Sequence, residues 1–414
     1  MEKRYISIIT AVALFLAAFL AGGCVYSFDP QVDGEGGYMI VEGNIVIGDI
    51  SQIRLNYSWS LVDSLASQDE ERVKILYGSS MRIEDSKGGV YKNTMVQDSW
   101  SSWWGGSGSK SPIGSFDLRE ADPSLEYRLV IENEKGTYTT DWAKPLDPGV
   151  IDALKARKSE DGSTLGILIS SHSSDPEGSY YRWTVNETWQ YHADVSAIYK
   201  FVYKLTPRGK ITEPEVVPMG NGESLFDCWN SARRSEIMTA STGDLSEDRL
   251  VDHQLYALDD QDEKVSVKYH PEVTQMRLSE DAYRYWQMME RNASDVGGLF
   301  SPEPSEFRGN VVNRDNPEEL VLGYVGVMQV VRESIFFDNY VERFYHRRGG
   351  TLPAPDTLSV DADYIDAFQK GWLPAVDIYD EVTGRWIGYE WWPARCIDCR
   401  MKGGTTVKPA GWPS

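Results

Sequence analysis

Two cysteines near the end of the chain, Cys396 and Cys399, stand two residues apart in the segment CIDCRMKGGTTVKPAGW. Such a pair can supply half of a zinc site, act as a thiol–disulfide redox couple, or take part in a structural disulfide. Redox surroundings select among these chemistries, because disulfides persist in oxidising compartments and are rare in the cytosol. The rest of the sequence therefore decides what the pair does.

The sequence lacks the partners that a zinc site or a redox site would need. A structural zinc ion takes four ligands, whereas Cys228 has no second cysteine at C-x-x-C spacing. The five histidines are scattered: His172, His192, His253, His270 and His346. A redox pair of the thioredoxin type begins a helix in a βαβ unit, but this pair follows GYEWWPAR and precedes a Gly-Gly coil. The residues thus predict no metal site and favour a structural disulfide.

Residues 1–23 have the features of a secretory signal peptide. Positive residues precede an apolar run from Ile6 to Leu20, which is shorter than the ~20 apolar residues of a membrane-spanning helix. The ending of small residues before Cys24 resembles a bacterial lipobox, although Ala21 stands where leucine is usual. We therefore expect Cys24 to be the lipidated first residue of the mature protein; an uncleaved anchor and a secreted protein are the alternatives.

A secreted chain would keep its remaining cysteines in oxidising surroundings, where a disulfide is expected. Cys228 could pair with Cys396 or Cys399 and join the C-terminal tail to the domain that contains Cys228. Alternatively, Cys396 and Cys399 could close a small ring and leave Cys228 buried. A bridge that closes a loop of roughly 100 residues or more stabilises the fold by about 4 to 5 kcal/mol, but the spacing does not determine the pairing.

Short alternating runs begin after a predicted tether at residues 24–35. In YMIVEGNIV, the apolar residues Met39, Val41 and Ile45 share one parity, as in a half-buried strand. About seven such runs, separated by turns, occur in residues 36–145. This pattern predicts an immunoglobulin-like β-sandwich.

The segment KPLDPG, residues 144–149, interrupts strand and helix patterns and predicts a domain boundary. Residues 146–414 are expected to form a larger β-rich domain, because strand-like alternation resumes in YYRWTVNETW. One main helix is predicted near residues 279–292, with Ser279 as its N-cap and apolar residues at helical spacing. The predicted fold class is mostly β.

Three tryptophans, Trp100, Trp103 and Trp104, lie in a Ser- and Gly-rich segment at residues 98–109. Exposed indole rings offer flat faces to a sugar, a peptide or a partner protein. The alternative is that these rings pack onto neighbouring strands as a lid. They are the candidate residues for contact with a ligand or partner.

Charge and missing motifs exclude several classes of function. The net charge of −22 argues against nucleic acid as a partner, because phosphates would be repelled. The chain contains no H-E-x-x-H, no G-x-S-x-G, no phosphate-binding loop and no dinucleotide fingerprint. We therefore expect no catalytic residues and no cofactor. The paired carboxylates of a hydrolase cannot be recognised in a sequence, so a cryptic hydrolase is kept as an alternative.

Several segments, taken in order, resemble one family. They include CVYSFDP, YMIVEGNIV, DPEGSYYRWTVNETW, CWNSARRSEIMTASTGDLSED and CIDCRMKGGTTVKPAGW. Together they resemble an uncharacterised outer-membrane lipoprotein family of Bacteroidota, whose members are typically encoded beside TonB-dependent receptors. The resemblance implies a location and a partner, but it brings no catalytic residues.

The sequence and the resemblance together lead to one expectation. The protein is expected to be lipid-anchored at the outer membrane, on a face that the sequence does not specify. It would serve as a non-catalytic binding or accessory component of a TonB-dependent receptor in nutrient capture or uptake. Its ligand would be an unidentified small molecule, peptide or glycan. A structural or adhesive surface lipoprotein is the second hypothesis.

Overall fold

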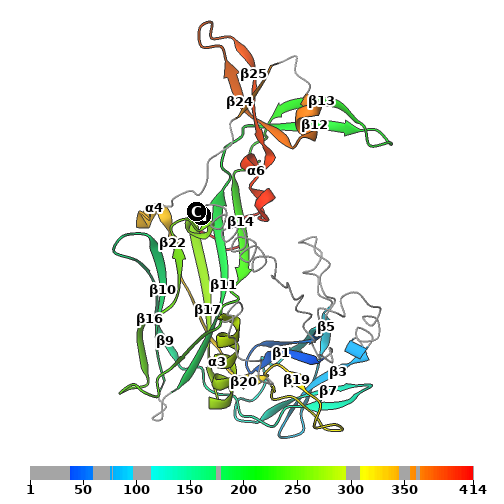
Figure 1. Cartoon of the computed structure of the whole chain (residues 1–414), viewed down its shortest axis with the longest axis vertical. Helices are drawn as coiled ribbons and strands as arrows, with labels where there is room; N and C mark the ends of the chain where they lie inside the picture. The colour runs from blue at the N-terminus through cyan, green and yellow to red at the C-terminus, as the bar shows by residue number, and fades with distance from the viewer. Residues whose placement is uncertain are drawn as a thin grey trace, which may run out of the picture. The chain divides into compact units, whose positions relative to one another are not determined.

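The computed structural model describes residues 38–58, 75–76, 78–96, 113–173, 179–294, 308–344, 355–359 and 364–413. Strands dominate these residues, which confirms the predicted mostly β fold (Figure 1). The described helices are α3 (Glu280–Ser294), α4 (Asn339–Glu342), α5 (Tyr364–Gln369) and α6 (Ala394–Ile397). None of the helices in these ranges has the length and apolar character of a membrane span. The predicted signal peptide, Cys24 and the tether lie outside the described residues.

The first β-sandwich consists of two sheets. One sheet has the strand order β1-β2-β6-β5, and the other has the order β4-β3-β7-β8. Their bounds are β1 Met39–Val46, β2 Ile50–Tyr57, β3 Ser80–Asp85, β4 Val90–Lys92, β5 Thr94–Val96, β6 Ile113–Asp117, β7 Tyr127–Asn133 and β8 Gly136–Thr139. Lettered in chain order, these sheets are the ABED and CFG sheets of the immunoglobulin fold, with β4 as an added strand beside C. The predicted immunoglobulin-like sandwich is confirmed.

Alternate side chains of both sheets form the core of this sandwich. Met39, Ile53 and Phe116 are fully buried there, as the alternation in the sequence predicts. Tyr127, at the start of β7, is also fully buried, and its hydroxyl donates a hydrogen bond of 2.7 Å to the carbonyl oxygen of Asp122. This contact is the tyrosine corner of immunoglobulin-like domains, which fixes the connection into the F strand.

A later segment of the chain returns to complete the first sandwich. β18 (Val312–Asn313) pairs with β8, while β19 (Val321–Leu322) and β20 (Gly326–Met328) run parallel to β1. The sandwich therefore includes residues well beyond the region 36–145 in which the alternating runs predict it. Strands of two or three residues are too short to show an alternating pattern, so nothing in the sequence indicates this return.

The second sandwich repeats the strand order of the first. One sheet has the order β9-β10-β16; in the other, β11 lies between β14 and β17, and β17 also pairs with β21. β15 extends the pairing of β11, and β22 that of β17. The bounds are β9 Val150–Lys158, β10 Thr164–His172, β11 Tyr180–His192, β14 Asp227–Arg233, β15 Met238–Ser241, β16 Arg249–Asp259, β17 Lys268–Leu278, β21 Val331–Ser334 and β22 Phe337–Asp338. The second region is thus β-rich, as predicted.

The helix α3 follows β17 and matches the predicted main helix to within two residues at its end. Ser279 precedes it, and the Ser279 hydroxyl oxygen accepts a hydrogen bond of 3.3 Å from the backbone N–H of Ala282. This is the expected N-cap interaction. On its inner face, Ala282 is buried in a small cluster with Met276 and Met328. The apolar residues at helical spacing in the sequence therefore mark the face of α3 that packs against this cluster.

Two segments far apart in the sequence form a small unit that we call the hairpin module. It contains β12 (Tyr199–Leu205), β13 (Ile211–Pro218), α5, β23 (Asp356–Ser359), β24 (Trp372–Tyr379) and β25 (Trp386–Pro393). The segments are joined by a backbone hydrogen bond of 2.9 Å from Ile198 to Ala375. The Tyr199 hydroxyl also donates to Asp377 at 2.7 Å. β12 thus lies against β24 although the hairpins are more than 150 residues apart in the chain.

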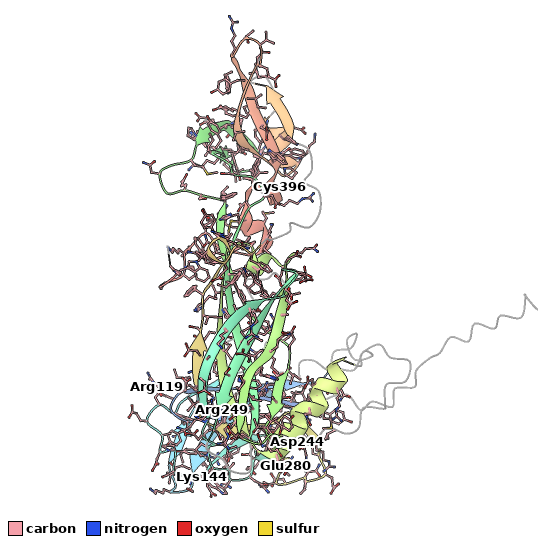
Figure 2. All side chains as sticks on the ribbon, turned by 90° about the vertical axis from the view of Figure 1, so that its left-hand side faces the viewer. Arg119, Lys144, Asp244, Arg249, Glu280 and Cys396 are labelled. Carbon is pink, nitrogen blue, oxygen red and sulfur yellow. A yellow bond between two sulfur atoms is a disulfide. The ribbon has the colours of Figure 1, made fainter. Side chains whose placement is uncertain are left out.

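The cysteine pairing is long-range. Cys228, in β14, forms a disulfide with Cys399 across a sequence separation of 171 residues, and Cys396 is a buried free thiol. Figure 2 shows Cys396 at the end of the second sandwich opposite to Arg249. The tail is docked by further contacts, since Trp229 and Thr405 exchange two backbone hydrogen bonds of 2.8 Å. Of the pairings left open by the sequence, the structure contains the one that joins the tail to the second domain.

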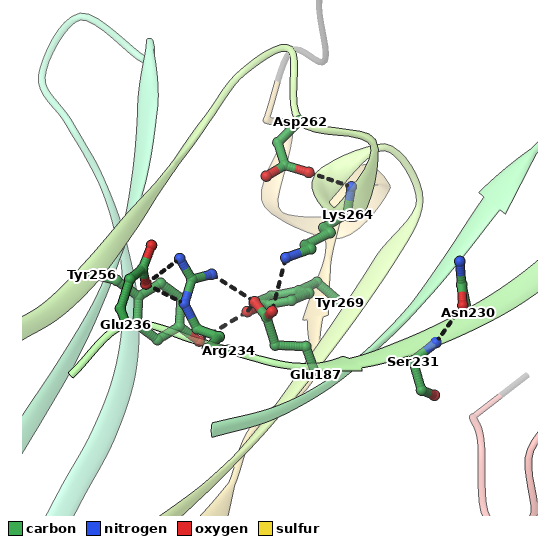
Figure 3. A network of polar contacts seen from close by, with 9 residues as sticks. All are labelled: Glu187, Asn230, Ser231, Arg234, Glu236, Tyr256, Asp262, Lys264 and Tyr269. Carbon is green, nitrogen blue, oxygen red and sulfur yellow. Dashed lines mark hydrogen bonds and ion pairs between the residues drawn. The ribbon is translucent and has the colours of Figure 1, made fainter. Parts of the chain in front are cut away.

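A buried carboxylate organises the centre of the second sandwich (Figure 3). The Glu187 side chain is 1% exposed and accepts hydrogen bonds of 2.7 Å from both Arg234 and Lys264. The Tyr269 hydroxyl donates to the same carboxylate. Burial, followed by the neighbouring Tyr256 and the charge of Glu187, raises the pKa of Tyr269 far above its usual range, so this hydroxyl remains a donor. The network connects β11, β17 and the loop after β14.

Removal of the disulfide is expected to destabilise the protein strongly. The variant Cys228→Ala/Cys399→Ala should lose about 5 kcal/mol of unfolding free energy, because a loop of 171 residues would gain freedom in the unfolded chain. Urea denaturation of the purified variant measures this loss. Cys396→Ala is the matched control and should retain the bridge in a non-reducing peptide map. Equal stability of the double variant and the native protein would contradict the role of the bridge.

The Glu187 network allows a second test of stability. Glu187→Ala would leave Arg234, whose side chain is 9% exposed, buried without its main carboxylate, and we expect a loss of about 3 to 5 kcal/mol in urea denaturation. Glu236 contacts the same guanidinium but is 57% exposed, so Glu236→Ala should cost less than about 1 kcal/mol. Similar losses in the two variants would show that the buried carboxylate has no special role.

Candidate functional site

A groove of about 790 Å³ lies where the hairpin module meets the disulfide-linked end of the second sandwich. This volume is in the usual range of ligand pockets, roughly 300 to 1,000 Å³. Its apolar lining includes Tyr199, Phe201, Met219, Leu225, Trp229, Phe368 and Leu373. Its charged lining consists of Lys200, Glu223, Asp227, Asp398 and Arg400. The groove is therefore lined by aromatic and by charged side chains, which we call its aromatic wall and its charged floor.

The aromatic wall is held in place by its own packing. The rings of Phe201 and Phe368 stack with centroids 4.7 Å apart, and Trp391 packs edge-on against Phe201 at 6.0 Å. The hydrogen bond from Tyr199 to Asp377, together with burial, raises the pKa of Tyr199 to about 12. Tyr199 therefore remains protonated, and its hydroxyl keeps β12 against β24. The wall exists before any ligand binds.

The charged floor consists of side chains that pair with one another. Lys200 donates to Glu223 at 2.7 Å. Arg400 donates twice to Asp398, at 2.8 and 2.7 Å, and this bond raises the pKa of Arg400. Asp227 lies 3.0 Å from the ring nitrogen Nε2 of His192. These pairs fix the side chains while leaving the outer lone pairs and protons available to a ligand.

The disulfide positions this floor. Cys228 stands between Asp227 and Trp229, and Cys399 stands between Asp398 and Arg400, so the bridge brings four lining residues together. Asp398 also caps the short helix at Cys399–Lys402 through a hydrogen bond of 3.0 Å from the backbone of Arg400. The cysteines stand out in the sequence, but the sequence did not lead us to the groove. The charged residues beside the cysteines, Asp227, Asp398 and Arg400, are the signal that could have indicated it.

Among the other predicted site residues, Cys396 is 2% exposed in α6 and does not line the groove. Trp100, Trp103 and Trp104, the candidate contact residues, lie outside the described residues. In the described part of the chain, no three His, Cys, Asp or Glu side chains gather as ligands of one metal ion would.

Comparison with known proteins gives a family but no assigned activity. No curated protein matches the chain in sequence. Among solved structures, a similar chain occurs in the "Complete structure of manganese lipoxygenase of Gaeumannomyces graminis and partial structure of zonadhesin of Komagataella pastoris", at 10% identity and a TM-score of 0.16. That similarity covers 59% of this chain and 89% of the other, and a TM-score this low supports no conclusion about fold or function.

Residues 25–334 match the family model described as "Domain of unknown function (DUF4249)". The matched region contains both sandwiches up to β21, together with the β12–β13 hairpin. It ends before α5, β24 and the tail, whose residues Phe368, Leu373 and Arg400 line the groove. Because the match extends over most of the sequence, this chain belongs to the DUF4249 family.

Proposed function

We propose that the protein is a non-catalytic binding component of the cell envelope, anchored at the outer membrane through Cys24. In this proposal it works beside a TonB-dependent receptor in nutrient capture or uptake. The observation that carries the binding role is the preformed groove of about 790 Å³. A site whose side chains are already ordered loses little entropy when a ligand binds.

The lining of the groove favours an amphipathic ligand. Stacked rings at Phe201 and Phe368 offer apolar surface, while the facing ion pairs offer both donors and acceptors. A ligand with apolar and polar sides, such as a short peptide or a glycan, could contact both walls. The groove is thus suited to a molecule that lies along it.

The same charges support a binding role over a hydrolytic one. A glycosidase needs one carboxylate that can give up a proton and a second that can act as base or nucleophile. The three carboxylates that line the described groove are each engaged by a cation or an imidazole: Glu223 by Lys200, Asp227 by His192 and Asp398 by Arg400. This arrangement favours recognition of a ligand over proton transfer to it.

A shared membrane supports the partnership with a receptor. A lipid on Cys24 would confine the protein and the receptor to two dimensions, which raises their effective concentration without any new contact. The sequence segments that resemble an outer-membrane lipoprotein family support this role, because that resemblance implies a TonB-dependent receptor as neighbour. The tryptophans at positions 100, 103 and 104 remain candidates for the contact.

Co-purification tests the partnership. Tagged protein from solubilised outer membranes is expected to bring down a TonB-dependent receptor in a stoichiometric amount, identified by mass spectrometry. The variant Cys24→Ala should disappear from the membrane fraction and lose the receptor. Recovery of the native protein alone would exclude the proposed partnership and favour an independent adhesive role.

The groove is tested with the substrate of the receptor that co-purifies. Phe368→Ala removes half of the stacked pair and should weaken binding about tenfold in calorimetry, as loss of a well-packed aromatic contact does. Tyr379→Ala removes an exposed ring of the same module that does not line the groove, so it should leave the affinity unchanged. Thermal unfolding confirms that both variants are folded. Equal affinities would show that the ligand binds elsewhere.

A further inference from the structure

A second pocket, of about 600 Å³, shares Asp227 and Trp229 with the groove. We call it the C-terminal pocket, because the last described residues form one of its sides. Figure 1 marks the C-terminus beside α4 and β22, the elements that form another side. Its polar and aromatic lining includes Gln190, His192, Lys268, Asn339, Tyr340 and Trp412.

The ionised side chains of this pocket balance one another. Asp227 and Asp338 carry two negative charges, and Lys268 and Lys408 carry two positive charges. Lys268 lies 3.4 Å from Asp338, and Asp227 lies against His192. The pocket thus has no excess charge, although the whole chain has a net charge of −22. An ion would gain little here, so the balance favours an uncharged ligand.

The polar side chains of the pocket have unused hydrogen-bonding capacity. The Gln190 side-chain oxygen accepts from the Trp412 indole N–H at 3.2 Å, and its nitrogen donates to Asp227 at 3.4 Å. An amide offers two donor hydrogens and two acceptor lone pairs, so one of each remains. The Asn339 side-chain nitrogen donates to the backbone carbonyl oxygen of Val265, and its side-chain oxygen accepts no hydrogen bond from the described residues. Hydroxyl groups, which both donate and accept, match this mixture of groups.

An exposed aromatic ring stands at the rim. Tyr340 is 92% exposed, yet its backbone is fixed, because its N–H donates at 3.0 Å to Asp338, the residue that caps α4. Trp412 is 7% exposed and is held edge-on against Phe336 at 5.2 Å. A solvent-exposed ring on a fixed backbone offers a flat apolar face beside the polar pocket.

A peptide fits this lining less well than a sugar does. Peptides commonly bind by adding a strand to a free sheet edge. Of the edge strands at this site, β22 has only two residues, and β14 is already covered at Trp229 by the tail residue Thr405, which takes both backbone hydrogen bonds. Side chains therefore make up the contact surface here.

We infer that the C-terminal pocket binds an uncharged sugar unit of a glycan. The C–H face of the sugar ring packs on Tyr340, and its hydroxyls pair with Gln190, Asn339 and Lys408. This assignment concerns a site distinct from the groove, and it does not depend on the receptor. Trp229 and Asp227 line both pockets, so the two sites adjoin and one extended glycan can reach both.

The purified full-length mature protein is screened on an array of neutral oligosaccharides, and the strongest one is titrated by calorimetry. We expect saturable binding that Tyr340→Ala weakens about 5- to 10-fold, the usual effect of losing an aromatic face. Lys408→Ala should weaken it about 2- to 10-fold through a lost hydrogen bond. Tyr379→Ala, which removes an exposed ring that lines neither pocket, should change the affinity less than about twofold.

Three results would overturn the inference. The first is that the protein binds no neutral oligosaccharide on the array. The second is that Tyr340→Ala and Lys408→Ala both leave the affinity unchanged. The third is that the protein binds short peptides in place of glycans and that Tyr340→Ala weakens this peptide binding. Both substituted side chains are exposed, so the variants are expected to fold, and their thermal transitions verify this. Since no receptor is present in this assay, its outcome is independent of the co-purification.

Discussion

The disulfide between Cys228 and Cys399 is the constraint on which both pockets depend. It holds the C-terminal tail against β14, where Trp229 and Thr405 then pair through their backbones. Asp398 and Arg400 of the groove floor and the tail side of the C-terminal pocket come from this docked tail. Because the bridge closes a long loop, it acts mainly by restricting the unfolded chain, and the local contacts then select one arrangement.

Strand β11 connects the docked tail to the core of the second sandwich. Near its end, the Tyr191 hydroxyl donates at 2.7 Å to the carbonyl oxygen of Cys399. In its middle, Glu187 is buried among cations and a tyrosine, a geometry that stabilises only when every partner is present. Nearer its start, Trp183 fills the core and donates at 2.9 Å to Gln275. A single strand thus carries the core, the buried charge network and the docking site of the tail.

Local patterns in the sequence predicted the parts of the fold that depend on local periodicity. The alternation around Met39 and the capped helix after Ser279 both appear in the structure. Long-range features were not predictable, because β18 to β20 are too short to show a period and the groove joins segments that lie far apart along the chain. The pairing of Cys228 with Cys399 was one of several possibilities for the same physical reason: spacing along the chain does not specify distance in space.

The boundary of the family match divides the residues that line the two pockets. The match ends at residue 334, whereas Phe368, Asp398 and Arg400 line the groove, and Tyr340, Lys408 and Trp412 line the C-terminal pocket. The second sandwich supplies one side of each site, with residues of β12 added in the groove, and residues beyond the match supply the other side. A change in the tail can therefore alter the lining of both pockets without disturbing either core, because the tail contributes few residues to the cores. The disulfide makes this arrangement possible, because it holds in place a tail that buries few apolar side chains.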